Sequence, residues 1–340
     1  MATFATFDSL PPEIHDMIFG EVISSTLPCP DYERDQQEDR VQLKDVSYRH
    51  RSGVTRVKWQ KTQTAHPADA LLLVNPRVRA EAKVARKRVV RKLPCHADVM
   101  FAAEAELHPT FLSVYTDATH FDVVHAQFRV VGLPDAAVFA PEEKTTDPRA
   151  IWWAHDRNMP HVNWMFFDLL HRFLKAGLRL SQPEEVDRHI TVRRLEINVL
   201  SPPDLSLLPP KDVSFHTWLL ARRPRRITAT RYGRRVDEEQ EDEKKDLHRT
   251  QMRPEWLCDW IAGNIRRLTA MDYSTMHYGG IFYERIDEIV VLLDGEERAI
   301  FKLGEMLSEL YPWGSAIQEW KEKAIKERLE TGLSVVNSNE

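Results

Sequence analysis

An amphipathic helix is predicted over residues 10–23, LPPEIHDMIFGEVI, because the apolar residues in this stretch recur at helical spacing. These residues are Leu10, Ile14, Met17, Ile18 and Val22. Two prolines near the start suit the first turn of a helix, where a missing amide hydrogen costs little. The pattern therefore predicts one apolar helix face close to the N-terminus.

A hairpin and a second helix are expected next along the chain. β-rich runs at residues 41–48 and 54–61 lie on either side of RHRSG and predict a β-hairpin. Asn75 suits a helix N-cap and Pro76 a first helical position. The apolar stripe that follows consists of Val78, Ala82, Ala85, Val89 and Leu93. We therefore expect a helix up to residue 93 that packs on a core.

Beyond residue 93, strand patterns alternate with helix patterns. Strands are expected at THFDVV (119–124), FRVVG (128–132), 190–200 and 286–293, and helices at 161–177, 213–222, 254–268, 296–310 and 315–332. The last helix begins at Ser315 and carries Gln318 three residues later, as in a capping box. Strands that alternate with helices favour a mixed sheet carrying helices. The predicted fold class is mixed α/β.

Three regions follow from this order of elements. Residues 1–93 are expected to form an N-terminal helical region with the inserted hairpin, residues 94–333 an α/β body, and residues 334–340 a frayed tail. Within the body, residues 222–250 contain a basic run, RRPRRITATRYGRR, followed by the mostly acidic DEEQEDEKKD. This stretch lacks a periodic apolar face, so we expect an exposed, mobile insertion.

Two N-terminal segments, LPPEIHDMIFGEVI and ALLLVNPRVRAEA, occur in an order that resembles the F-box-like domain of a large fungal protein family. The resemblance covers roughly the first third of the chain. In that family, apolar helix residues dock the small adaptor subunit of Skp–cullin–F-box ubiquitin ligases. An amphipathic helix does so by presenting side chains at i, i+4 and i+8 to a groove. By resemblance, the adaptor-binding residues here are Leu10, Pro11, Ile14, Ile18, Val22, Leu72, Leu73 and Val74.

The N-terminal region also departs from the F-box pattern. Residues 24–69 separate the two matching segments, Pro76 interrupts the second one, and Arg79 stands where many F-boxes carry tryptophan. An alternative is therefore that the apolar face of the first helix covers the core of the body and docks nothing.

Motifs for catalysis, nucleotides or zinc are missing from the sequence. Neither Gly-x-Gly-x-x-Gly nor the phosphate-binding Gly-x-x-x-x-Gly-Lys-Ser/Thr pattern occurs, nor do Gly-x-Ser-x-Gly and Cys-x-x-Cys. His155, Asp156 and His161 lie close together, but Pro160 interrupts them and no third group is indicated. The aromatic residues Trp152, Trp153, Trp164, Phe166 and Phe167 are expected in the core. We expect no catalytic residues, no metal and no cofactor, and hence no enzyme.

The cysteines and the lack of targeting segments point to an intracellular protein. The three cysteines are odd in number and far apart, unlike a disulfide framework. The net charge of −5 does not suggest that the chain as a whole binds nucleic acid. The N-terminus does not resemble a secretory signal, and no stretch is apolar enough for a membrane span. The expected location is the cytoplasm or the nucleus, with no membrane partner.

Two local basic patches provide an alternative function. The residues of interest are Arg79, Lys83, Arg86, Lys87, Arg222, Arg223, Arg225 and Arg226. Such patches contact nucleic-acid phosphates or serve in nuclear import. Two hypotheses therefore remain after the sequence: a non-catalytic interaction protein that acts as a substrate receptor or scaffold, and a nuclear protein associated with nucleic acid. The protein substrate of such a receptor is not encoded in any recognisable motif.

Overall fold

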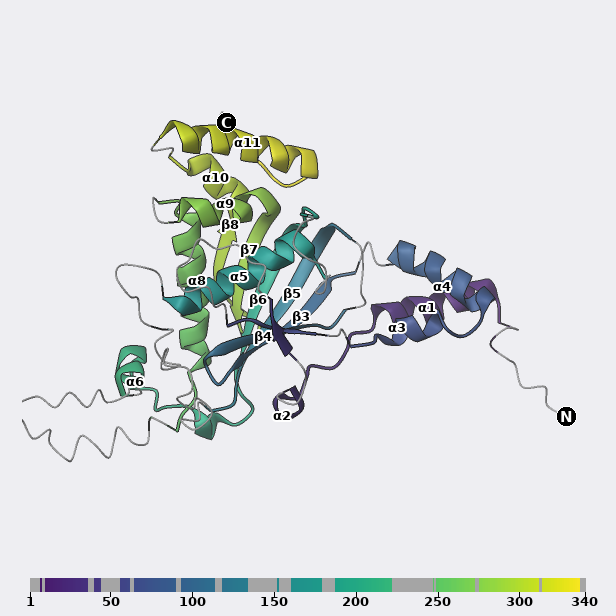
Figure 1. Cartoon of the computed structure of the whole chain (residues 1–340), viewed down its shortest axis with the longest axis horizontal. Coiled ribbons are helices and arrows are strands. Elements are labelled where there is room, and N and C mark those ends of the chain that lie inside the picture. The colour runs from purple at the N-terminus through teal and green to yellow at the C-terminus, as the bar shows by residue number, and fades with distance from the viewer. Residues whose placement is uncertain are drawn as a thin grey trace, which may run out of the picture.

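The computed structural model describes residues 7, 10–35, 40–43, 56–61, 64–89, 93–113, 118–133, 152, 160–178, 187–221, 247, 249–272, 275–311 and 314–336. Figure 1 shows that the described residues form two parts. Helices α1 (Pro12–Ser24), α3 (Pro67–Leu71) and α4 (Pro76–Val89) project to one side, and we call them the arm. The remaining elements surround a β-sheet, and we call them the body.

The body is built on a six-stranded mixed sheet, which confirms the predicted fold class. The strands are β3 (Cys95–Ala102), β4 (Glu106–Phe111), β5 (His120–Val131), β6 (Thr191–Leu200), β7 (Ile286–Leu293) and β8 (Glu296–Lys302). Their order across the sheet is β4-β3-β5-β6-β7-β8. The four inner strands run parallel, and the two edge strands are antiparallel to their neighbours.

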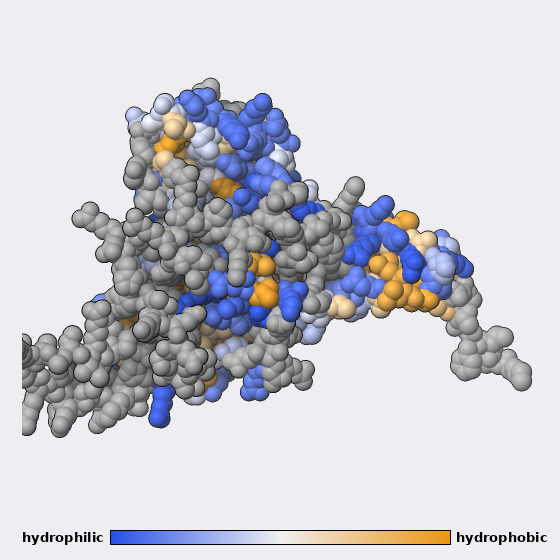
Figure 2. All heavy atoms as spheres, viewed as in Figure 1, coloured by the Kyte–Doolittle hydropathy of each residue, from blue (hydrophilic) through white to orange (hydrophobic). Residues whose placement is uncertain are grey.

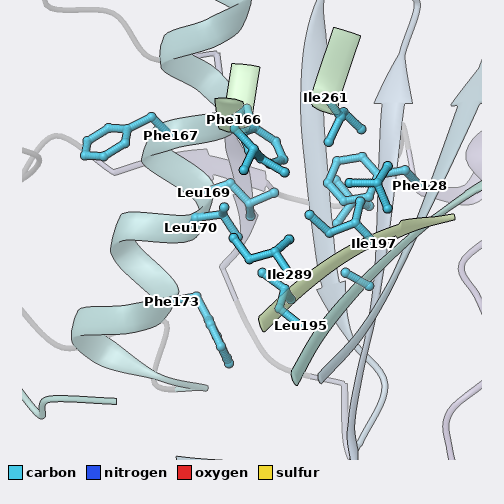
Figure 3. Packing of buried hydrophobic residues seen from close by; sticks show 14 of the residues in the cluster. Phe128, Phe166, Phe167, Leu169, Leu170, Phe173, Leu195, Ile197, Ile261 and Ile289 are labelled. Atoms are coloured by element: carbon cyan, nitrogen blue, oxygen red, sulfur yellow. The ribbon is translucent and has the colours of Figure 1, made fainter. Parts of the chain in front are cut away.

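The remaining helices are α2 (Tyr32–Asp35), α5 (His161–Ala176), η4 (Leu205–Leu207), α6 (Phe215–Ala221), α8 (Pro254–Thr269), α9 (Met276–Arg285), α10 (Leu303–Glu309) and α11 (Ser315–Thr331). Among them, α5 and α8 lie over one face of the sheet. Figure 3 shows Phe166, Leu170 and Phe173 of α5 pointing toward the sheet, where Leu195 and Ile197 meet them. The alternation predicted for residues 190–200 therefore describes which side chains of β6 enter the core.

Several expected elements have other boundaries in the structure. The segments predicted as two strands, 119–124 and 128–132, form the single strand β5, and β3, β4 and α9 were not predicted. The helix predicted at 296–310 is wrong over its first half, which is β8. Asp294 and Gly295 both have positive φ, 51° and 86°, and form a two-residue turn that folds β8 back onto β7.

The last helix has its predicted bounds, but its N-terminal cap and the tail that follows it differ from the prediction. Gly314, and not Ser315, occupies the N-cap, and no side chain caps the helix there. The chain leaves the helix at Gly332, as expected, with φ 76°. The predicted tail is not frayed at its first residue, because the amide of Ser334 donates to Asp287 Oδ1 at 3.0 Å.

The base of the predicted hairpin lies at one edge of the sheet, and residues 44–55, which include its turn, are outside the described residues. Strand β1 (Arg40–Gln42) pairs antiparallel with β2 (Lys58–Gln60). Val57 bridges to Leu107 of β4, and both Val57 and Trp59 lie in the core of the body. At the other edge, β8 carries a bulge and mostly charged, exposed residues, features that discourage pairing with another chain. The inserted hairpin thus packs on the body, although its sequence lies between α1 and α4.

The arm has a small hydrophobic core of its own. Its buried residues are Phe19, Ile23, Ala68, Val78, Ala82 and Ala85, and Val22, Leu71, Leu72, Val89 and Leu93 pack around them. The stripe predicted on α4 is therefore confirmed. The predicted cap is also present, because the amide of Val78 donates to Asn75 Oδ1 at 2.8 Å. The arm core is separate from the core of the body.

Candidate docking surface

Helix α1 has two apolar faces, and only one of them is buried. His15, Phe19 and Ile23 face the arm core at i, i+4 and i+8. Ile14 and Met17 lie on a second face and are 38% and 67% exposed. A helix with an apolar face that its own protein leaves uncovered presents that face to solvent or to a partner.

The eight residues assigned by resemblance to adaptor binding all belong to the arm, and none of them is fully buried. Pro11, Ile14, Leu73 and Val74 are exposed, whereas Leu10, Ile18, Val22 and Leu72 are half-buried. Leu73 and Val74 lie in the turn between α3 and α4 and are 78% and 62% exposed. Figure 2 shows hydrophobic residues gathered on the surface of the arm.

The alternative role for this face, covering the core of the body, is not what the structure shows. Val22 and Leu72 pack against the arm core, and Ile14 is exposed. The residues that hold α1 in place are instead Phe19 and Ile23, which the sequence analysis did not single out. His15, Phe19 and Ile23 follow one another at intervals of four residues, as on one face of a helix. The sequence analysis missed this face because its first residue is a polar histidine.

His15 connects α1 to α4 inside the arm. Its Nδ1 lies 2.9 Å from Glu81 Oε2, and its Nε2 lies 2.7 Å from the carbonyl oxygen of Phe7. Arg77 donates to the other oxygen of Glu81 at 2.9 Å. Because both ring nitrogens face acceptors, the charged imidazolium satisfies both bonds. The hydrogen bond to the Phe7 carbonyl, followed by that to Glu81, raises the pKa of His15 above 6.5.

The raised pKa of His15 makes the stability of the arm depend on pH. A group whose folded pKa lies above its unfolded value contributes stability that is complete below the unfolded pKa and is lost as pH rises through the folded pKa. We expect the amides of α1 and α4 to be better protected from hydrogen exchange at pH 6 than at pH 8, after correction for intrinsic rates. The His15→Gln variant should lose this difference. An NMR titration that places the pKa of His15 at or below 6.5 would contradict the prediction.

The basic residues predicted as a phosphate or import patch are divided by the structure. On α4, Arg86 lies 3.3 Å from Asp69, and Arg79 Nε donates to the carbonyl oxygen of Leu72 at 2.6 Å. Lys83 and Lys87 are exposed and form no ion pair with other described residues. Arg222, Arg223, Arg225 and Arg226 lie outside the described residues, as does most of the predicted insertion 222–250. The structure thus brings together only part of this patch, and nucleic-acid binding stays a prediction.

Other predicted site residues lie in the core or outside the described part of the chain. Trp152, Phe166 and Phe167 are buried, as expected, and Trp164 is partly buried against the core. His155, Asp156 and Trp153 are not among the described residues, and neither is the side chain of His161.

The sheet face opposite the helices, called here the open face, carries a row of charged side chains. His125 Nδ1 lies 2.7 Å from Glu196, and Arg194 donates to Glu196 at 2.7 Å and to Glu288 at 2.6 Å. Burial alone would raise the pKa of Glu196, but the hydrogen bond from Arg194 and the charge of His125 lower it. Each charge has an opposite neighbour, so the row neutralises itself and attracts neither anions nor cations strongly.

Neither a metal site nor a membrane-spanning helix is found among the residues that the structure describes. There, no group of three or more His, Cys, Asp or Glu side chains is arranged to hold a metal ion. No helix in the described ranges is both long and apolar enough to cross a bilayer.

Comparisons with known proteins do not assign this chain to a family. A scan against protein-family models, a search of curated proteins and a search of solved structures each returned no match. The assignment of a function therefore depends on the geometry of the arm and on the motif resemblance in its sequence.

Proposed function

We propose that this chain is a non-catalytic interaction protein whose arm docks the adaptor subunit of a Skp–cullin–F-box ubiquitin ligase, so that the body serves as a substrate receptor. The observation that carries the proposal is the exposed apolar face of α1, accompanied by Leu73 and Val74 in the neighbouring turn. Such a ligase works in the cytoplasm or nucleus, which is where we expect this protein.

The energetics favour docking of this face by a partner. Full burial of one Val, Leu, Ile or Met side chain contributes about 1.5–3 kcal/mol relative to exposure. The exposed apolar residues of the arm include Ile14, Met17, Leu73 and Val74. A groove that covered all four side chains would recover a substantial binding energy, of which a few central residues usually supply most.

The structure also removes one objection to the F-box resemblance. Residues 24–69 separate the two matching segments in sequence, yet α1 and α4 pack on one small core. This is possible because the inserted hairpin packs on the body and not between the two helices. Pro76 is likewise compatible with the fold, since it occupies the first position of α4.

The proposal is tested by coexpressing the full chain with a fungal ligase adaptor and analysing the mixture by size-exclusion chromatography. We expect a one-to-one complex. Ile14→Asp and Leu73→Asp should each weaken it at least about 30-fold, the loss typical of a residue worth 2 kcal/mol or more at an interface. Both side chains are exposed, so circular dichroism of these variants should match the parent protein.

Leu329→Asp is a matched control, because Leu329 is an equally apolar and exposed residue on α11 of the body. It should leave the complex intact. Failure of the folded parent protein to bind the adaptor would refute the ligase role and leave an F-box-like scaffold. Equal weakening by the control would show that binding is unspecific hydrophobic association.

A further inference from the structure

The segment that leaves α1 crosses the open face of the sheet and is held there at several points. We call residues Leu27–Tyr32 the strap. The amide of Leu27 donates to the carbonyl oxygen of Leu112, at the end of β4, at 2.8 Å. Further along, Arg129 Nη2 of β5 donates to the carbonyl oxygen of Pro30 at 3.0 Å. The strap is thereby bonded to residues from two strands of the body.

Arg129 is itself fixed by a buried carboxylate. Its Nε and Nη2 donate to the two oxygens of Asp98, each at 2.7 Å, and Asp98 is fully buried. A two-bond arginine–carboxylate pair sets the plane of the guanidinium group. Removing Arg129 would leave the buried charge of Asp98 unpaired, and removing Asp98 would leave the guanidinium group of Arg129 without a set orientation. The donor that reaches Pro30 therefore has a defined position.

At the far end of the strap, the ring of Tyr32 packs against Gly132. A Cβ atom built on Gly132 would lie 2.4 Å from Cε1 of that ring, a distance at which atoms overlap. Gly132 also has φ 71°, which side-chain-bearing residues rarely adopt. Glycine is thus needed here both for the backbone turn after β5 and for the close approach of Tyr32.

At its start, the strap is held to the arm by hydrogen bonds of His66. Nε2 of the buried His66 lies 2.8 Å from the carbonyl oxygen of Ser25, and its Nδ1 accepts from the amide of Ala68. The connection from α4 to the sheet is also short, since Leu93 packs against the arm core and Cys95 already lies in the core of the body. A third connection runs from Trp59 of β2, in the core of the body, to Ala68 of α3, in the arm core. The first two connections leave little length for a hinge.

From these contacts we propose that the strap locks the arm to the body, so that the two parts form one rigid unit with a set orientation. The exposed face of α1 then points in a constant direction relative to the body. This inference holds whichever partner the arm binds. A receptor built in this way holds whatever is bound to the body at a fixed distance from whatever is bound to the arm.

Distances between two spin labels on the full chain, measured without any partner, test the proposal. Val84→Cys places one label on α4 and Leu329→Cys the other on α11, and both positions are exposed. A Cys29→Ser background removes the exposed native thiol, while Cys95 and Cys258 are buried. Cys29 lies in the strap and its Sγ contacts Gln127 Oε1 at 3.7 Å, and serine keeps a donor at this position. We expect one narrow distance distribution for this protein.

Two strap variants should turn that narrow distribution into a broad one. Tyr32→Ala removes the ring that packs on Gly132. The double variant Asp98→Asn/Arg129→Gln removes the bond to Pro30 without leaving an unpaired buried charge. Tyr311→Ala, which changes an exposed aromatic residue far from the strap in sequence, should keep the narrow distribution.

Either of two results would overturn the proposal. One is a broad distribution in the Cys29→Ser background without a further change in the strap, which would mean that the arm already moves freely. The other is an unchanged narrow distribution in variants that circular dichroism shows to be folded. If the double variant fails to fold, Tyr32→Ala decides alone, since Tyr32 is only half-buried at the surface. Because no adaptor is present, the outcome is separate from that of the adaptor-binding test.

Discussion

Replacing Arg328 by alanine is expected to destabilise the body by about 3–5 kcal/mol, the range for removing one partner of a buried ion pair. Arg328 is fully buried in α11. Its Nη2 donates to Asp287 at 2.6 Å, Nη1 to the carbonyl oxygens of Tyr283 and Ile286, and Nε to that of Ser334 at 2.8 Å. Burial lowers the pKa of Arg328, while the charge of Asp287 opposes this change.

The size of the effect follows from what alanine would leave behind. Three backbone carbonyls and one carboxylate would lose a donor where little water can replace it. These acceptors come from the end of α9, the start of β7 and the C-terminal segment, so Arg328 holds three parts of the chain together. Gly304 also lies close to this side chain, which limits how far the site can rearrange.

Thermal unfolding followed by circular dichroism measures the loss of stability. For a chain of this size we expect the Tm of Arg328→Ala to fall by roughly 10 °C. Arg328→Lys keeps the charge but not the fork of donors, so it should fall between alanine and the parent protein. The control Lys326→Ala changes an exposed residue on the same helix and should alter stability by no more than about 0.5 kcal/mol. A Tm of Arg328→Ala equal to that of this control would contradict the assigned role.

Replacing Phe19 by alanine is expected to unfold the arm while the body stays folded. Phe19 is fully buried, and its ring lies 5.9 Å from that of Phe7 and 6.1 Å from that of His15, measured between centroids. A Phe-to-Ala change in a core costs about 3–5 kcal/mol. The arm core is small, so a loss of this size removes most of what holds α1 against α4.

Hydrogen exchange by mass spectrometry distinguishes local from global unfolding. In Phe19→Ala, peptides from α1 and α4 should exchange as fast as unfolded chain, whereas β6 and β7 keep the protection of the parent protein. Met17→Ala is the matched control, since Met17 lies on the same helix but is exposed, and it should preserve protection in both parts. Equal loss of protection in β6 would mean that arm and body unfold as one cooperative unit.

Elements whose side-chain periodicity matches their surroundings were predictable from the sequence. The stripe of α4, the strands β6 and β7, and helix α8 all have one side facing a core, and their patterns record that side directly. Several residues that begin or end helices could also be recognised in the sequence. Asn75 caps α4, and Gly177 and Gly332 end their helices with positive φ.

The sequence of α1 predicted an apolar face but not whether that face is exposed. Helical spacing identified Ile14 and Ile18 as an apolar face, but spacing does not tell whether such a face is buried or exposed. That distinction depends on Phe19 and Ile23, which occupy the arm core and leave the first face outside. The residues proposed to bind an adaptor were named by resemblance, and only the fold shows that Pro11, Ile14, Leu73 and Val74 among them are exposed.

By itself, the sequence determined the mixed α/β class, most of the amphipathic helices and the caps at Asn75, Gly177 and Gly332, because each depends on residues close together in the chain. The tertiary structure decided the rest. Residues 296–302 form a strand because β7 offers hydrogen bonds along its edge. Asp98 pairs with Arg129, and Arg328 with Asp287, across wide sequence separations. A buried charge is tolerated only where a partner meets it, and no local pattern shows where distant parts of the chain will meet.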